Sequence, residues 1–139
     1  MMLVRTYLAS SAIEGLGVYA DEYIPSGTLI WNFNPKFVAT FSQRDIEKLP
    51  VHTREFVEKY AFPHPFKSNH LIVELDNGRF MNHSDEPNTD FIVFGKGYAI
   101  RDIAPGEEIT SNYHEFDPTF VGGFANYQQP QNSYQPGQN

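Results

Sequence analysis

The chain has 139 residues, of which 40% are hydrophobic, 15% aromatic and 19% charged. This length predicts a single domain with one buried core, and the composition excludes both a disordered chain and a membrane-spanning one. The sequence contains no cysteine, which excludes disulfides, zinc knuckles, iron–sulfur clusters and thiol nucleophiles. Residues 1–9 form no apolar run of signal-peptide length, so we expect an intracellular protein, cytoplasmic or, in a viral or eukaryotic source, nuclear.

The net charge is acidic, because 17 Asp and Glu residues outnumber 10 Lys and Arg residues and give a formal charge of -7 at pH 7. Nucleic-acid binders usually present a basic surface, so we expect no direct nucleic-acid partner. An acidic surface accelerates encounters with cationic partners, and a protein segment rich in lysine or arginine fits this charge. Many acidic proteins have no such partner, so the charge alone does not identify one.

Short apolar and β-branched runs are interrupted by glycine, proline and asparagine, a pattern that predicts many short strands. The expected strands cover residues 3–8, 17–22, 28–33, 37–41, 71–75, 91–94, 98–103 and 108–110. Turns are expected at residues 25–27 and 95–97, and at residues 76–78, where Asp, Asn and Gly tolerate positive φ. The predicted fold class is therefore mostly β.

One segment departs from this β pattern. Ser42 can cap a helix that runs to about residue 49, and residues 53–60 predict a second helix after Pro50. We therefore expect a domain over residues 1–117 with a helical insert at about residues 42–69. Residues 118–139 are first aromatic and then rich in Gln, Asn and Pro, a composition that predicts a flexible C-terminal tail.

The first of three motifs is Gly-Leu-Gly-Val-Tyr-Ala at residues 15–20, which formally matches a dinucleotide-binding fingerprint. That fingerprint requires a helix to begin at the glycines, whereas β-branched and aromatic residues follow here, so the match is rejected. A glycine pair between two strands lets backbone groups approach a ligand closely. An ordinary β-turn explains the same pair and is the more common origin of such a pattern.

The second motif is Arg-Phe-Met-Asn-His-Ser at residues 79–84, and the third is Gly-Glu-Glu-Ile-Thr-Ser-Asn-Tyr at residues 106–113. The second is rich in side chains that both donate and accept hydrogen bonds, as in a polar ligand site or in a loop that satisfies its own backbone. His83 and Ser84 are adjacent and point apart in regular backbone, which makes a hydrolase pair a poor interpretation. The third motif ends in Tyr113, and a tyrosine taken alone is usually a packing residue.

Taken together and in this order, the three motifs resemble the SET-domain family of protein lysine methyltransferases. The resemblance spans about residues 3–116, and residues 100–113 (Ile-Arg-Asp-Ile-Ala-Pro-Gly-Glu-Glu-Ile-Thr-Ser-Asn-Tyr) are especially close to the family pattern. Without the cysteine-rich modules that flank many members, the chain is similar to the short bacterial and viral ones. The resemblance implies a β-clip type SET fold of several small sheets, with a C-terminal pseudoknot in which the second motif passes through a loop formed by the third.

The resemblance also implies a reaction, namely methyl transfer from S-adenosylmethionine to the ε-amine of lysine in a protein, with S-adenosylhomocysteine as product and no metal. The substrate would be a histone-like or another basic protein. Carried over to this sequence, Tyr113 is the catalytic residue and Tyr60, from the insert, a second catalytic aromatic residue. The cofactor-binding residues would be Gly15, Leu16, Gly17, Arg79, Phe80, Asn82 and His83. The lysine channel would be lined by Ser111, Phe116 and Phe120, with Phe124 and Tyr127 as further candidates for a wall that trailing modules supply elsewhere.

Ser111 stands two residues before Tyr113, where the family usually carries Phe or Tyr, so we expect a roomier channel that permits di- or trimethylation. The five histidines are scattered and lack the spacing of metal ligands, so no metal site is expected. Two other functions stay open: a degenerate SET fold that binds peptide or cofactor without transferring methyl groups, and a β-rich viral structural protein. A homodimer that completes the substrate groove is also compatible with the sequence.

Overall fold

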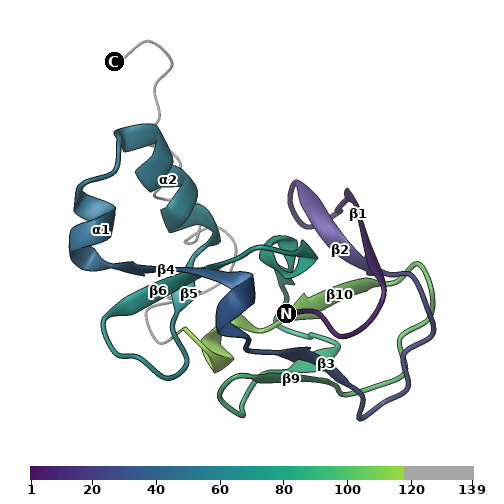
Figure 1. The fold of residues 1–139 in the computed structure, drawn as a ribbon. Coiled ribbons are helices and arrows are strands. Elements are labelled where there is room, and N and C mark those ends of the chain that lie inside the picture. Colours follow the sequence, from purple (N-terminus) through teal and green to yellow (C-terminus); the bar gives the residue numbers. More distant parts are fainter. Residues whose placement is uncertain (118–139) are drawn as a thin grey trace.

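The computed structural model describes residues 1–117, which fold into three small β-sheets with two short helices beside one of them (Figure 1). The first sheet has the order β1 (Thr6–Ser10), β2 (Leu16–Ala20), β10 (Glu108–Ser111) and β7 (Asn82–His83). The second has the order β3 (Leu29–Asn32), β9 (Lys96–Ala99) and β8 (Thr89–Asp90), and the third β4 (Val38–Ser42), β6 (His70–Glu74) and β5 (Phe62–Pro63). The expected mostly-β class with several small sheets is confirmed.

The helical insert is also confirmed, with α1 (Gln43–Glu47) and α2 (Val51–Tyr60) next to the third sheet (Figure 1). Ser42 begins α1 in a capping box, since its hydroxyl accepts from the Asp45 N–H at 3.2 Å and its own N–H donates to the Asp45 carboxylate at 2.7 Å. A small cluster attaches both helices to β6 and consists of Ile46, Val57, Ala61 and Val73. The two helices therefore form one unit with the third sheet.

The main hydrophobic core joins the first and second sheets. It consists of Val18, Ala20, Ile24, Ile30, Trp31, Met81, Ala99, Ile103 and Ile109. Burying one such branched side chain contributes about 1.5–3 kcal/mol. Since these residues come from nearly the whole described chain, the core connects distant segments.

β10 brings the second and third motifs together. It pairs antiparallel with β2 and parallel with β7, where Thr110 is opposite Asn82 and Ser111 is opposite His83. The Ser84 N–H then donates to the Ser111 carbonyl at 2.9 Å. These contacts, between residues about 28 apart in the sequence, place the two motifs side by side, as the expected pseudoknot requires.

A buried asparagine reinforces this junction. Asn88 is 2% exposed, its amide nitrogen donates to the Glu108 carbonyl at 2.8 Å, and its amide oxygen accepts from the Thr110 N–H at 2.9 Å. Replacing Asn88 with alanine should therefore destabilise the fold by about 2–3 kcal/mol, because two buried backbone groups lose their partners. Urea denaturation tests this, with the exposed Gln43→Ala as a control expected to change stability by about 0.5 kcal/mol or less. Equal stability of the two variants would contradict this role.

The expected strand at residues 91–94 is wrong. β8 ends at Asp90, whose carboxylate accepts from the Ile92 N–H at 2.7 Å, and residues 92–94 form an exposed loop. The following turn comes about two residues earlier than expected, with a bond of 3.1 Å from the Lys96 N–H to the Val93 carbonyl, and β9 begins at Lys96 instead of residue 98. The reason is tertiary: the Phe91 ring lies over Gly97, where a Cβ would come within 2.5 Å of it.

The turn expected at residues 76–78 forms without a positive φ at any of these three residues. Asp76 instead caps the 3₁₀ helix η2 (Asn77–Phe80), and its carboxylate accepts from the Gly78 N–H at 3.0 Å. Two other 3₁₀ helices, η1 (Pro35–Phe37) and η3 (Tyr113–Glu115), are likewise capped by asparagine side chains. Short polar side chains thus organise these turns by accepting backbone hydrogen bonds.

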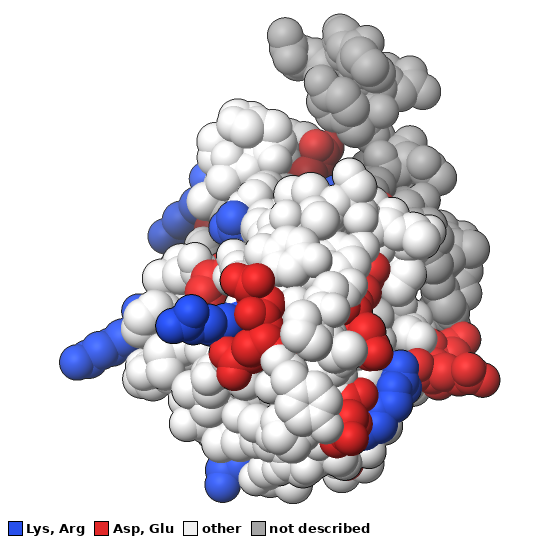
Figure 2. Space-filling view, turned by 90° about the vertical axis from the view of Figure 1, so that its right-hand side faces the viewer, with Lys and Arg blue, Asp and Glu red and all other residues white. Residues whose placement is uncertain are grey.

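One face of the described chain is mixed in charge. Figure 2 shows acidic and basic side chains in scattered groups separated by uncharged surface, on the face that carries the first sheet. The longest helix within residues 1–117, α2, has 10 residues. No helix in that part combines the length and the apolarity that crossing a membrane requires.

Candidate functional site

A cavity of about 670 Å³ brings the three motifs and the helical insert together. Of the predicted site residues, Gly15, Leu16, Tyr60, Arg79, Phe80, Asn82, His83, Ser111, Tyr113 and Phe116 line it. Gly17 does not line it, and Phe120, Phe124 and Tyr127 lie outside the described residues, as does the whole tail 118–139. The volume lies within the range of pockets that bind cofactors or other small molecules.

Asn82 connects all three motifs at one edge of this cavity. Its amide nitrogen donates to the Glu14 carbonyl at 3.1 Å and to the Leu16 carbonyl at 3.2 Å, on either side of Gly15. It also donates to the Glu108 carboxylate at 3.1 Å. The Asn82 side chain is therefore held in one orientation by the first and third motifs.

Gly17 has a role next to Glu108. A Cβ at this position would stand 2.8 Å from a Glu108 carboxylate oxygen, closer than real contacts allow. The space thus left open lets Glu108 accept hydrogen bonds from the Ser11 hydroxyl at 2.6 Å and from the Tyr19 hydroxyl at 3.3 Å, besides that from Asn82. The glycine pair was expected to allow a close approach to a ligand. At Gly17 the group that approaches closely is instead the Glu108 side chain, which positions Asn82.

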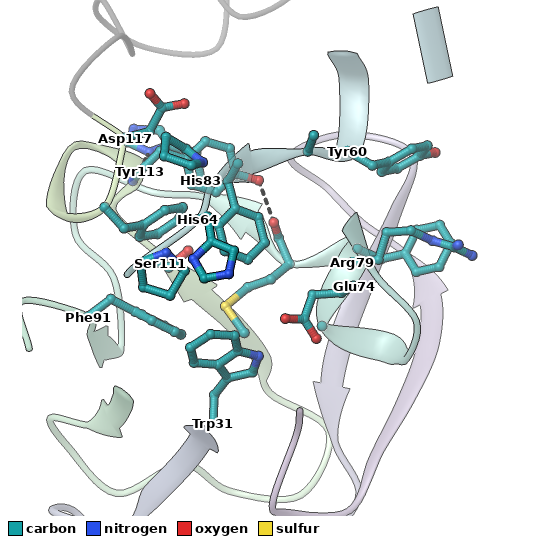
Figure 3. A pocket seen from close by; sticks show the side chains of 18 of the residues that line it. Trp31, Tyr60, His64, Glu74, Arg79, His83, Phe91, Ser111, Tyr113 and Asp117 are labelled. Atoms are coloured by element: carbon teal, nitrogen blue, oxygen red, sulfur yellow. Dashed lines mark hydrogen bonds between the residues drawn. The ribbon is translucent and has the colours of Figure 1, made fainter. Parts of the chain in front are cut away.

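Tyr113 lies against the loop at residues 82–83. Its hydroxyl donates a short hydrogen bond to the Met81 carbonyl, drawn as a dashed line in Figure 3, and its N–H donates to His83 Nδ1 at 3.1 Å. His83 Nε2 is 2.8 Å from the Asp85 carboxylate. Since Nδ1 accepts a hydrogen bond, the proton of the neutral ring is on Nε2, where it is donated to Asp85.

An aromatic cluster surrounds Tyr113. The Phe116 ring lies 5.6 Å from the Tyr113 ring and 5.5 Å from the rings of both Phe62 and Phe91. Trp31 adds a further wall, 5.6 Å from Phe91. Trp31, Phe62 and Phe91 were not among the predicted site residues, because nothing local distinguishes a cavity-lining ring from an ordinary core ring.

Tyr60 does not join that cluster. At the end of α2 it contacts Phe80, with ring centres 5.6 Å apart, and the Arg79 guanidinium lies 4.7 Å from the Phe80 ring and 5.7 Å from the Tyr60 ring. Figure 3 accordingly shows Tyr60 and Arg79 on the opposite side of the view from Tyr113 and Phe91. Within this single cavity we therefore distinguish a part around Tyr113 and a part around Arg79.

Two titratable groups in the wall have shifted pKa values. Burial, with the nearby charges of His70 and Lys67, lowers the pKa of His64, so its imidazole is neutral at pH 7. Burial raises the pKa of Glu74 to about 7. Glu74 was not among the predicted site residues either. Among residues 1–117, no group of three or more His, Asp and Glu side chains is arranged to hold a metal ion.

Known proteins with similar sequences identify the family to which the chain belongs. The SET-domain family model matches residues 15–114, and the chain belongs to this family. It is 29% identical over 110 residues, 73% of this chain, to an H3 lysine-36-specific histone-lysine N-methyltransferase of Cryptococcus neoformans. It is 28% identical over 123 residues, 81% of this chain, to human histone-lysine N-methyltransferase 2D. The match spans only 13% and 2% of these two proteins.

A solved structure shows the same fold. The crystal structure of a candidate histone methyltransferase of Plasmodium falciparum superimposes with a TM-score of 0.57 at 23% identity, over 81% of this chain and 95% of that chain. The expected SET fold is therefore confirmed, and the chain is homologous to histone-lysine methyltransferases.

Proposed function

We propose that this protein transfers methyl groups from S-adenosylmethionine to the ε-amine of lysine in a basic protein substrate. The main support is that the Tyr113 hydroxyl, anchored on the Met81 carbonyl, lines the same cavity as the Asn82 loop. SET domains typically use S-adenosylmethionine, which agrees with a two-part cavity.

We assign the part around Arg79 to the cofactor. When bound, S-adenosylmethionine supplies a methyl group on a positively charged sulfur. Backbone groups of Gly15 and Leu16 would contact it, together with Arg79, Phe80 and Asn82, all of which line the cavity. His83, which contacts Tyr113, would approach the cofactor from the other part. Tyr60 would form an aromatic wall of this part, since its contacts are with Arg79 and Phe80. The fit is supported by the fixed Asn82 amide and by the buried Glu74 carboxylate, which can face a positive charge.

We assign the part around Tyr113 to the substrate lysine. A free lysine has a pKa of about 10.4, so fewer than about one in a thousand are neutral, and nucleophilic, at pH 7. The rings of Trp31, Phe62, Phe91 and Phe116 exclude water and favour the uncharged amine. Because the Tyr113 proton is donated to Met81, the phenol oxygen can accept a hydrogen bond from this amine and orient it.

Ser111 would determine how many methyl groups fit. It is buried in the cavity wall, and its hydroxymethyl group is much smaller than the aromatic ring usual at this position in the family. Wild-type protein should therefore form di- or trimethyl-lysine, and Ser111→Phe should shift the product to monomethyl-lysine. Mass spectrometry of exhaustively treated substrate measures this, with Ser111→Ala as the small-residue control. Only monomethyl product from wild type would refute the prediction.

The substrate proposal is a histone-like or another basic protein. It is supported by the net charge of -7 and by relatives that are named as histone-lysine methyltransferases. A homodimer stays a prediction, which sedimentation of the purified protein tests.

The function is tested in two incubations, each of which contains the protein and methyl-labelled S-adenosylmethionine. One incubation contains core histones as substrate and the other contains ribosomal proteins. We expect label on lysine in at least one mixture. If no label is transferred, calorimetric titration with the unlabelled cofactor shows whether the protein still binds it. Binding without transfer to either mixture would favour the degenerate, binding-only SET fold, and absence of binding would reject the proposal.

A further inference from the structure

The cavity wall contains a buried acidic side chain. Glu74, at the end of β6, is 1% exposed and lines the cavity. Within the described chain, neither of its carboxylate oxygens accepts a hydrogen bond of ordinary geometry, although the Trp31 indole is near enough to influence it. Burying a carboxylate without hydrogen-bond donors is expensive, so such a group is rare unless a ligand or a nearby positive charge compensates it.

The charged groups around Glu74 compensate it only in part. The amino group of Met1 lies 3.5 Å from one carboxylate oxygen, but it also donates to the Asn32 carbonyl at 2.7 Å. Asp76 adds a second negative charge nearby, and its own carboxylate is used by the N–H groups of Met2 and Gly78. Burial and Asp76 raise the pKa of Glu74, whereas the Met1 amine and the Trp31 indole oppose the rise.

The carboxylate faces the cavity, although both of its oxygens are buried. Gly78 also lines the cavity, and even a Cβ at this position would already touch a Glu74 oxygen, at 3.5 Å. Figure 3 shows the carboxylate directed toward the space above Trp31, between the Tyr113 side and the Arg79 side. Aromatic and apolar walls leave little water to screen a charge here, so a cationic group in this space would be attracted strongly.

We propose that Glu74 is the cation-recognition group of this cavity and binds a positively charged onium group of a ligand. The inference rests on the proposed function, whose two ligands each carry such a group: a sulfonium in the cofactor and an ammonium in the protonated lysine. Recognition of the sulfonium would also favour release of S-adenosylhomocysteine, which is a neutral thioether at the same position. Glu74 would thus help the protein to distinguish methyl donor from product.

The test compares charged ligands with uncharged analogues on wild type and Glu74→Gln at pH 8, by calorimetry. In the first arm the ligands are S-adenosylmethionine and S-adenosylhomocysteine. In the second they are n-butylamine and n-butanol, in the presence of S-adenosylhomocysteine. We expect Glu74→Gln to reduce the preference for the charged ligand about tenfold in one arm, which identifies the source of the cation. The Glu74→Asp variant should retain part of the preference. Glu107 is exposed, so the control variant Glu107→Gln should retain all of it.

An unchanged preference in both arms, with wild type binding S-adenosylmethionine, would overturn the role of Glu74 and leave the proposed function intact. If wild type binds neither S-adenosylmethionine nor S-adenosylhomocysteine, the proposed function and this inference both fail. A role of Glu74 limited to anchoring Met1 would change stability and leave both preferences unchanged.

A melting experiment without any ligand checks that the carboxylate is poorly compensated in the folded protein. The pKa of Glu74 is raised from 4.5 to about 7, so the folded state binds the proton more tightly than the unfolded state. The stability that the protonated Glu74 contributes is therefore lost as pH rises from about 4.5 to about 7. Glutamine does not titrate, so the Glu74→Gln variant does not lose stability in this way. The variant should melt about 5–10 °C above wild type at pH 8 and gain much less at pH 4. A lower melting temperature than wild type at pH 8 would show a well-compensated carboxylate and overturn the inference.

Discussion

Replacing Tyr113 with phenylalanine should lower the rate of methyl transfer by about 100-fold, an effect typical of removing one preorganised hydrogen-bonding group from an active site. The variant keeps the ring, and therefore its contact with Phe116 at 5.6 Å, but loses the hydroxyl that is anchored on the Met81 carbonyl. Without this oxygen, the lysine amine loses an acceptor that would fix its direction of approach. Single-turnover kinetics with labelled cofactor measures the change.

Affinity for S-adenosylmethionine separates this effect from a general loss of structure. We expect the Tyr113→Phe variant to bind the cofactor within about threefold of wild type, because the assigned cofactor part lies around Arg79 and Asn82. Phe116→Leu serves as a control that perturbs the same ring cluster without touching the hydroxyl, and it should reduce the rate much less. A Tyr113→Phe variant with the wild-type rate would exclude the proposed role of the phenol.

Replacing Asn82 with alanine should weaken binding of S-adenosylmethionine by about 10- to 100-fold, which corresponds to the loss of one or two hydrogen bonds. The substitution removes the amide that donates to the Leu16 carbonyl and to Glu108, so the turn at Gly15 loses its attachment to β10. Calorimetric titration measures the affinity, and the melting temperature shows whether the variant is folded.

Two further variants test why Asn82 is effective. Asn82→Asp keeps the shape but places a carboxylate 3.1 Å from that of Glu108, so we expect an even weaker affinity at pH 8 and partial recovery at low pH. Glu108→Gln should weaken cofactor binding less than Asn82→Ala, since Glu108 acts through Asn82. Full affinity in Asn82→Ala would remove this loop from the cofactor site.

The local elements that depend on neighbouring residues were predictable from the sequence. Ser42 begins α1 because its capping partner, Asp45, is three residues away, and Pro50 separates the two helices as expected. Most strands were found within a few residues. The strand expected at residues 91–94 failed because Phe91, a typical strand residue, packs across Gly97 and the chain turns between them.

The site residues also fall into those that the sequence could identify and those that it could not. Tyr113, Asn82 and His83 could be named from motifs, because their residue types and order carry the family resemblance without reference to distance. Trp31 and Phe62 could not, since a ring in a core and a ring in a cavity wall have the same sequence signature.

By itself, the sequence determined the mostly-β class, the helical insert, the family and the motif residues, because these depend on residue type, local spacing and motif order. Only the tertiary structure decided that Gly17 makes room for Glu108, that Tyr60 and Tyr113 lie in different parts of the cavity, and that Glu74 is buried at its wall. Burial and charge compensation depend on which distant segments pack together, and a carboxylate that is ordinary in the sequence becomes unusual only when the fold removes its water and its hydrogen-bond donors.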